Sequence, residues 1–319
     1  MADASSAQLI EDLGMDKDTR EAFDGFLHLW TTGTTAGRRT PILRRPDEYG
    51  MEYEDVTFPS LDGTPLSGWF IPAEDAKAVI IHNHFLPGSR YGYAGHLPEF
   101  GGLGGFEVNF LPEYKALHDA GYAILAYDMR NHGMSGQGNG GIAGIGMTEW
   151  QDVVGSLRYA KARPDTQNMH KALLSVCLGA DSTAIAWDRM PEEFSEVEAM
   201  IMLQPVSGTY IVDTFAEGLG LGEAGYTAFD AAVHERTGFR LAEQTPLPHM
   251  GAIGVPTLVA QVHDDSMTKP QDVQDIYDAL PTDDKKLVWI EGTTERFRGY
   301  NYFGEHPAEA VDWFDSHVG

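Results

Sequence analysis

Residues 172–189 read Ala-Leu-Leu-Ser-Val-Cys-Leu-Gly-Ala-Asp-Ser-Thr-Ala-Ile-Ala-Trp-Asp-Arg, and this stretch decides the fold. The apolar run before the cysteine is typical of a buried strand, and the residues after the glycine are compatible with a helix. A tight turn joins the two, with Cys177 at its apex. Ser175 and Gly179 flank the apex because strand and helix backbones approach closely at such a strained turn. The pattern predicts a strand, a turn and a helix that present Cys177 as a candidate nucleophile.

Cys177 is the only cysteine of the chain. A single cysteine excludes an internal disulfide and argues against a cysteine-based zinc site. The alternative is that Cys177 is a small buried hydrophobic residue, as free cysteines usually are. Its place at the turn favours the nucleophile.

Composition and charge narrow the class of protein. The chain has 319 residues, of which 42% are hydrophobic and 22% charged, and its formal net charge is -26. Such a surface repels phosphate backbones and anionic lipid headgroups, so neither nucleic acid nor a membrane is expected as a partner. Residues 1–20 lack the basic and apolar regions of a signal peptide, and no apolar run approaches the roughly 20 residues of a membrane span. We expect a cytoplasmic protein.

The rest of the chain alternates between strand and helix patterns. Expected strands cover residues 54–58, 66–71, 78–82, 123–127, 172–177, 199–203, 257–262 and 286–290. Expected helices between and after them cover residues 111–120, 147–162, 180–190, 271–280 and 307–317. This order predicts an α/β fold with a mostly parallel eight-stranded sheet and helices on both faces.

Two segments fall outside the alternation. Residues 1–50 carry apolar side chains at helical spacing and are expected to form an N-terminal helical extension. Residues 205–256 hold helical fragments and no clear buried strand, which predicts a helical lid inserted between the two parts of the core, 51–204 and 257–319. The alternative is a surface insertion without a role at the site.

Two further strings carry a family resemblance. Residues 127–135 (Tyr-Asp-Met-Arg-Asn-His-Gly-Met-Ser) and residues 84–89 (His-Phe-Leu-Pro-Gly-Ser) follow expected strands. Together with the turn at Cys177 they resemble the α/β-hydrolase superfamily over residues 56–319, with detail similar to its dienelactone-hydrolase-like branch. The resemblance implies an α/β-hydrolase fold, no cofactor or metal, and an oxyanion hole made by the backbone N–H groups of Leu178 and Phe85.

The resemblance also implies an acid and a histidine. The acid is expected at Asp265, with Asp264 as the competing assignment. Glu295 stands where the family has its histidine, in the string Gly-Thr-Thr-Glu-Arg-Phe of residues 292–297. His306 is the other candidate for the missing group. The alternative for Glu295 is an ion pair with Arg296 that makes this loop structural.

These residues lead to one functional expectation and two alternatives. The first is a cysteine-dependent hydrolase or acyltransferase that acts on a small, largely uncharged and apolar ester, lactone or thioester. The second is a lyase, cyclase or isomerase that uses Glu295 and Asp265 for proton transfer, and the third is a ligand-binding protein without catalysis. The sequence leaves open whether the protein is a homo-oligomer.

Overall fold

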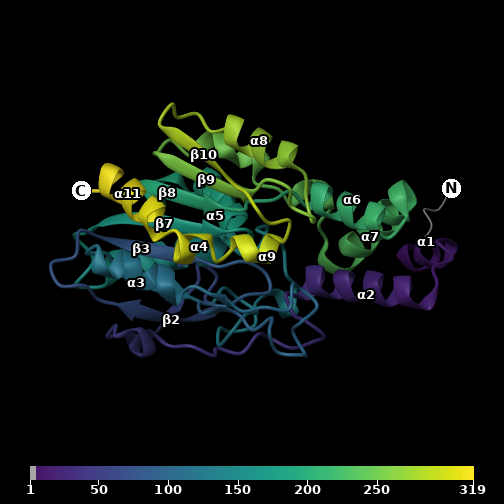
Figure 1. The fold of residues 1–319 in the computed structure, drawn as a ribbon, viewed down its shortest axis with the longest axis horizontal. Helices are drawn as coiled ribbons and strands as arrows, with labels where there is room; N and C mark the ends of the chain where they lie inside the picture. The colour runs from purple at the N-terminus through teal and green to yellow at the C-terminus, as the bar shows by residue number, and fades with distance from the viewer. Residues whose placement is uncertain (1–4) are drawn as a thin grey trace.

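An eight-stranded sheet forms the centre of the computed structural model, which describes residues 5–319 (Figure 1). The strands lie in the order β1-β2-β6-β3-β7-β8-β9-β10, in which β2 is antiparallel to both neighbours and all other pairs are parallel. Their bounds are β1 Glu54–Pro59, β2 Pro65–Ile71, β3 Ala78–Asn83, β6 Ala123–Tyr127, β7 His170–Val176, β8 Val197–Leu203, β9 Thr257–Val262 and β10 Lys285–Ile290. A separate two-stranded ribbon pairs β4 (Gly92–Tyr93) with β5 (Val108–Asn109). The predicted mostly parallel sheet is confirmed.

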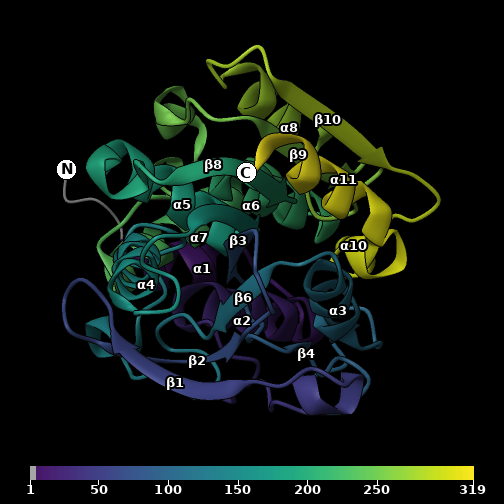
Figure 2. The same ribbon diagram turned by 90° about the vertical axis from the view of Figure 1, so that its left-hand side faces the viewer.

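Helices cover both faces of the sheet (Figure 2). Helices α3 (Leu111–Asp119) and α11 (Pro307–His317) pack on one face, and α4 (Trp150–Ala162), α5 (Leu178–Arg189) and α8 (Pro270–Asp278) on the other. Because side chains alternate along a strand, each central strand feeds both cores. In β3, Ile80 joins the first core while Val79 and Ile81 join the second. Every predicted core helix is present.

A helical layer lies beyond the sheet on the side of Cys177 (Figure 1). It combines α1 (Ser6–Asp12) and α2 (Lys17–Thr32) from the N-terminus with α6 (Gly208–Gly218) and α7 (Gly222–Thr237) from the insertion. The ring of Phe26 on α2 lies 4.3 Å from Phe215 and 5.5 Å from Phe229. Trp30 Nε1 donates a buried hydrogen bond of 2.8 Å to Gln244 Oε1. The two segments that break the alternation therefore pack on each other.

Short helical turns complete the chain. They are η1 Pro46–Tyr49, η2 Asn139–Gly141, η3 Pro191–Phe194, η4 Leu241–Glu243, η5 Leu247–Ala252, α9 Arg296–Gly299 and α10 Tyr302–Glu305. Within residues 5–319, no helix has both the length and the apolar character that a bilayer crossing requires.

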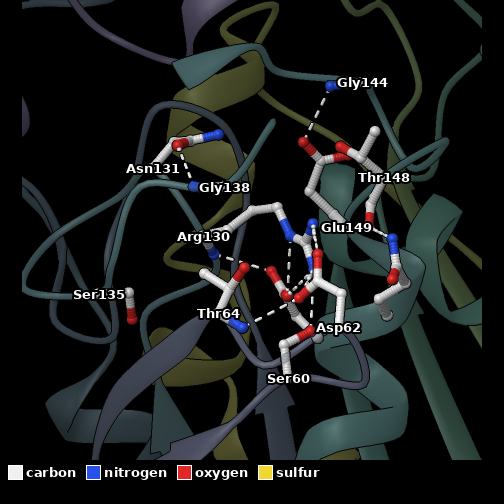
Figure 3. A network of polar contacts seen from close by, with 12 residues as sticks. Ser60, Asp62, Thr64, Arg130, Asn131, Ser135, Gly138, Gly144, Thr148 and Glu149 are labelled. Carbon is white, nitrogen blue, oxygen red and sulfur yellow. Dashed lines mark hydrogen bonds and ion pairs between the residues drawn. The ribbon is translucent and has the colours of Figure 1, made fainter. Parts of the chain in front are cut away.

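A buried arginine anchors the loops beside the site (Figure 3). Arg130, in the loop after β6, donates through Nε and Nη2 to Asp152 Oδ1 of α4 at 2.9 and 2.7 Å. Its Nη1 donates to Asp62 in the β1–β2 turn at 2.9 Å. Burial raises the pKa of Asp152, and the Arg130 guanidinium opposes that rise. The string at residues 127–135 thus joins three elements.

The start of α4 differs from the prediction because the preceding loop has its own turn. The Glu149 carboxylate accepts the backbone N–H groups of Gly144 and Gly146 at 2.9 and 3.0 Å, and the helix begins only at Trp150. This turn places Ile145 at the wall of the site.

Candidate active site

Cys177 sits at a sharp turn between β7 and α5. Its φ of 49° and ψ of -112° are strained for a residue with a side chain. A Cβ on Gly179 would lie 2.2 Å from the Asn83 carbonyl oxygen of β3, so only glycine fits there. The Ser175 hydroxyl accepts a hydrogen bond of 2.9 Å from the Asn83 amide. Gly179 is therefore required by close backbone approach, Ser175 is held by a side-chain hydrogen bond, and the turn leaves Cys177 8% exposed.

The backbone N–H groups of Leu178 and Phe85 are the ones expected to form an oxyanion hole. Leu178 is the first residue of α5, and Phe85 follows β3. Within residues 5–319, neither N–H has a hydrogen-bond acceptor. Both N–H groups are therefore free to donate a hydrogen bond to a ligand.

Two histidines order the loops near these donors. His84 Nδ1 lies 2.8 Å from the Phe85 carbonyl oxygen, and Nε2 accepts the Met129 N–H at 2.9 Å. This pattern fixes one neutral tautomer, in which Nδ1 donates. Burial lowers the pKa of His84 to about 4 and that of His132 to about 3, so both imidazoles are neutral at pH 7.

Arg296 occupies the position beside the thiol. It is the first residue of α9, and its side chain is buried. Nη1 donates to Asp265 Oδ2 at 2.7 Å, Nε donates to the Tyr300 hydroxyl at 2.9 Å, and Nη2 donates to the Gln204 carbonyl oxygen. Gln204 also donates through Nε2 to the Arg296 carbonyl at 2.7 Å. The guanidinium is thus fixed in place by three partners.

Cys177 lines the same chamber as Arg296 and Tyr300, and its sulfur contributes to the raised pKa of both groups. Burial alone lowers the pKa of Arg296, but Tyr300, Cys177 and Asp265 outweigh it and raise that pKa well above its usual value. Burial raises the pKa of the Tyr300 phenol well above its usual value, against the effect of Arg296. At pH 7 the site therefore holds a charged guanidinium and a neutral phenol next to the sulfur.

The structure brings one of the two candidate acids to this site. Asp265 is buried and accepts hydrogen bonds from Gln261 Nε2 and the Met267 N–H, both at 2.9 Å, in addition to Arg296. Asp264 points outward, where it pairs with His263 at 2.8 Å and its side chain is 71% exposed.

Glu295 and His306 are not brought to the thiol. Glu295 is the residue before the first turn of α9, and its side chain is exposed and makes no capping hydrogen bond. The Arg296 side chain points inward to Asp265 and does not pair with Glu295. The physical reason is the helix start: residues 295 and 296 leave the backbone in different directions, and only the second faces the sheet. His306 is exposed at the start of α11, with its ring 4.7 Å from Tyr302, and it lines neither cavity described below.

The sequence analysis missed Arg296, Tyr300 and Gln204 as site residues. One signal was present, because Arg296 and Tyr300 are four residues apart and such a pair faces one side of a helical turn. No sequence signal pointed to Gln204. It follows β8 with a positive φ of 52°, and a sequence pattern does not predict this conformation for glutamine.

The thiol opens into two connected spaces. Cys177, Arg296 and Tyr300 lie in the wall of a chamber of about 40 Å³, whose other lining residues are apolar. Phe26, Leu29 and several further residues also line an outer cavity of about 920 Å³. The outer cavity lies between α2, α6 and the loops at residues 102–104 and 295–297.

Helix α5 also carries a buried acid. Asp181 is buried one turn along α5, where Oδ1 accepts the Val206 N–H at 3.2 Å and Oδ2 has no partner within the described chain. Burial raises the pKa of Asp181 well above its usual value, and the nearby Asp272 carboxyl adds to this rise. Arg296 is the buried cation that acts on the carboxyl groups of Asp181, Asp265 and Asp272.

Known proteins resemble part of the sequence. No family model matches the chain. The curated relatives include the uncharacterized protein YfhR of Salmonella typhi and of Salmonella typhimurium, each 30% identical over 140 residues. That match covers 42% of this chain, and the chain spans 40% of the length of these relatives.

Solved structures match most of the chain. An esterase from Pyrococcus furiosus has a TM-score of 0.64 at 21% identity, covering 88% of this chain and 97% of its own. The α/β hydrolase GrgF from Penicillium has a TM-score of 0.58 at 17% identity, covering 84% of this chain and 99% of its own. A dienelactone hydrolase from Anabaena variabilis has a TM-score of 0.54 at 17% identity, with coverages of 84% and 99%. The chain has the α/β-hydrolase fold.

Proposed function

We propose that this protein is an enzyme that cleaves or transfers the acyl group of a small ester, lactone or thioester through an acyl-Cys177 intermediate. The observation that carries the proposal is a cysteine at the strained turn, beside a buried guanidinium and two backbone N–H groups without acceptors. A cation next to a cysteine favours the thiolate, which is the nucleophilic form. The likeness to esterases and hydrolases of the same fold is consistent with this chemistry.

Arg296 takes over one part of the work of a catalytic histidine. A guanidinium holds the thiolate and cannot accept its proton, because arginine stays protonated in proteins. Asp265 positions Arg296 through the bond of 2.7 Å. In this proposal a cation, and not a general base, is the group placed beside the sulfur.

Tyr300 is the group that can move a proton in this scheme. The thiolate attacks the carbonyl carbon, the N–H groups of Leu178 and Phe85 hold the oxyanion, and the C–O bond to the leaving group breaks. The departing alkoxide takes the Tyr300 proton, and Arg296 stabilises the phenolate through the bond of 2.9 Å. Water or an acceptor alcohol then returns a proton to the phenolate as its oxygen attacks the thioester, and the thiolate leaves.

The other expected functions have less support. Glu295 is exposed, and Asp265 is occupied by three donors, so neither is a free base for a lyase or isomerase. The presence of arginine in place of a base is the one observation that favours a ligand-binding protein without turnover.

Mass spectrometry of Cys177 tests the proposal. Incubation with p-nitrophenyl butyrate should release a burst of p-nitrophenol and add one butyryl mass to the Cys177 peptide, and Cys177→Ala should show neither. Turnover that survives Cys177→Ala would contradict the acyl-enzyme. Binding without acylation by any ester of a panel would select the ligand-binding protein.

Tyr300→Phe tests whether the phenol protonates the leaving group. With p-nitrophenyl butyrate the leaving group needs no acid, so acylation of Cys177 should persist in Tyr300→Phe at close to the wild-type rate. With ethyl butyrate, acylation itself should fall at least tenfold. Equal effects on both esters would argue that Tyr300 only packs against Phe85, on which its ring stacks at 4.1 Å.

A further inference from the structure

We infer that the outer cavity binds a long apolar arm of an uncharged or cationic ester, and that Gly25 on α2 keeps this cavity open. This inference rests on the proposed function for the reactive end of the substrate. The occupant is defined by the size, lining and charge of the cavity.

The size of the two spaces divides the substrate into two parts. A chamber of about 40 Å³ has room for the reacting carbonyl and little else. The outer cavity of about 920 Å³ is in the range of pockets that enclose whole organic ligands, roughly 300–1,000 Å³. A substrate whose carbonyl reaches Cys177 therefore places the rest of its body in the outer cavity.

The passage between the two spaces is apolar apart from Arg296. The residues that line both are Phe26, Leu29, Leu103, Ile211, Met267, Arg296 and Phe297. A polar chain in this passage would lose its hydrogen bonds to water without replacement. An alkyl or aryl arm instead gains from burial, at about 25 cal/mol per Å² of apolar surface.

Gly25 is unusual in its element. It lies in the middle of the 16-residue helix α2, where glycine is about 1 kcal/mol less favourable than alanine. A Cβ at this position would meet no atom within 4 Å, so packing does not require glycine. Gly25 lines the outer cavity, and a side chain there would project into its space. The need to leave room for a ligand explains why position 25 has no side chain.

The charges around the cavity select against anions. Glu21, Asp24 and Glu295 lie in its lining. Glu21 and Asp24 pair with Lys17 and Arg20 of the same helix, at 3.6 and 2.7 Å, and Glu295 makes no ion pair within residues 5–319. Among residues 5–319, Arg296 is the only arginine or lysine in this lining, and three of its five N–H donors are bound to Tyr300, Asp265 and Gln204. The chain as a whole carries a net charge of -26. A carboxylate or phosphate on the arm would be repelled, which disfavours fatty acids and nucleotide thioesters.

Ligand binding to Cys177→Ala tests the inference without catalysis. The neutral probe N-phenyl-1-naphthylamine should fluoresce on binding, and 1-octanol and octyltrimethylammonium should displace it. Octanoate, with a similar chain and a negative head, should displace it at least tenfold more weakly. Equal displacement by octanoate would overturn the charge preference.

Gly25→Phe in the same background should weaken probe binding at least tenfold by filling the cavity. Gly218→Phe is the matched control, because Gly218 is an exposed helical glycine with no atom within 4 Å of its Cβ position and lines neither cavity. Ala22→Trp fills the same cavity from the neighbouring turn and serves if Gly25→Phe does not fold. Unchanged probe affinity in both folded cavity variants would overturn the inference.

The enzyme with Cys177 intact gives a separate readout. The ratio of kcat/KM for p-nitrophenyl octanoate to that for p-nitrophenyl acetate should fall at least tenfold in Gly25→Phe and stay unchanged in Gly218→Phe. If neither ester acylates Cys177 while the binding results hold, the proposed function fails and the cavity assignment stands.

Discussion

At the scale of single residues, the site depends on charge balance around one buried cation. Arg296 pairs with Asp265 in a place where water does not reach either side chain. Removing one member of a buried pair leaves the other charge uncompensated, which costs about 3–5 kcal/mol. Any test of Arg296 must therefore separate its effect on the thiol from its effect on stability.

Arg296→Gln should slow the alkylation of Cys177 by iodoacetamide at pH 7 at least tenfold, because the thiolate loses its neighbouring cation. The double variant Arg296→Gln with Asp265→Asn removes both charges of the pair. It should be more stable than the single variant Arg296→Gln, and its alkylation should be as slow as that of the single variant. Arg296→Lys keeps a cation and should retain much of the rate. Intact mass against time measures the rates, and circular dichroism checks folding. Alkylation of the folded double variant at the wild-type rate would show that Arg296 does not stabilise the thiolate.

The sequence predicts the nucleophile position better than its partners. Gly179 is demanded by local backbone geometry, so the turn at Cys177 could be recognised from the spacing of the motif. The identity of the group beside the thiol depends on where α9 begins. A shift of one residue in the start of α9 decides whether Glu295 or Arg296 faces the thiol. The spacing of a family motif does not locate the start of this helix to one residue.

At the scale of elements, α3 docks on the sheet through an unusual buried pair. His82 Nε2 of β3 and Glu113 Oε1 of α3 lie 3.5 Å apart, and neither side chain has a hydrogen-bond partner within residues 5–319. Burial lowers the pKa of His82 well below its usual value and raises that of Glu113 to about 8. We therefore describe the pair as two neutral groups at pH 7 and not as an ion pair.

Glu113→Gln should remove a pH dependence of stability. The pKa of the folded-state carboxyl is about 8 against 4.5 for the free group, so the unfolded chain releases this proton first and stability falls as pH rises between these values. The slope is about 1.4 kcal/mol per pH unit. His82 acts in the opposite direction, because its pKa is lowered on folding and stability rises with pH below its usual pKa of 6.5. Between pH 6.5 and 8 the change of stability with pH therefore reports on the Glu113 carboxyl.

Urea unfolding of wild type and Glu113→Gln across that window measures the effect. The variant should gain stability over wild type as pH rises, and Glu74→Gln, at an exposed position, should follow wild type. Parallel curves for wild type and Glu113→Gln would mean that Glu113 is already ionised in the folded protein.

Trp30→Phe should loosen the contact between α2 and the insertion. The substitution leaves the buried Gln244 Oε1 without its donor, which costs about 1–3 kcal/mol. Hydrogen exchange should accelerate in α2, α6 and α7 and stay slow in β7. Trp289→Phe is the control, because its indole N–H donates no hydrogen bond in the described structure. Equal exchange in the insertion of both variants would mean that the Trp30 bond does not hold the layer.

The elements themselves were largely predictable, and their assembly was not. Strands such as Ala123–Tyr127 are buried along their whole length, so their sequences are continuous apolar runs. Such runs allow parallel strands to be recognised from the sequence. The start of α4 differs by three residues because the Glu149 carboxylate binds the backbone N–H groups of Gly144 and Gly146 and so closes a turn before the helix. The packing of α2 on the insertion joins residues more than 200 positions apart, and nothing local encodes it.

At the scale of the whole molecule, a net charge of -26 acts against compactness. Carboxylates that are brought together on folding repel one another over the screening length, which is about 30 Å at 0.01 M salt and about 10 Å at 0.1 M. The Tm should therefore rise by several degrees between 0.01 and 0.5 M KCl. KCl is chosen over sulfate because excluded kosmotropic salts stabilise proteins by another route.

A variant with Glu52→Gln, Glu74→Gln, Glu99→Gln and Asp283→Asn tests the origin of this rise. All four side chains are exposed and make no ion pair within residues 5–319, so their removal deletes repulsion and no identified contact. The variant should melt higher than wild type at 0.01 M KCl and gain less on addition of salt, so that the two Tm values converge near 0.5 M. Scanning calorimetry at both concentrations measures the effect. If the two proteins show the same increase with salt, the salt effect is not relief of surface repulsion, because the variant has less of it to relieve.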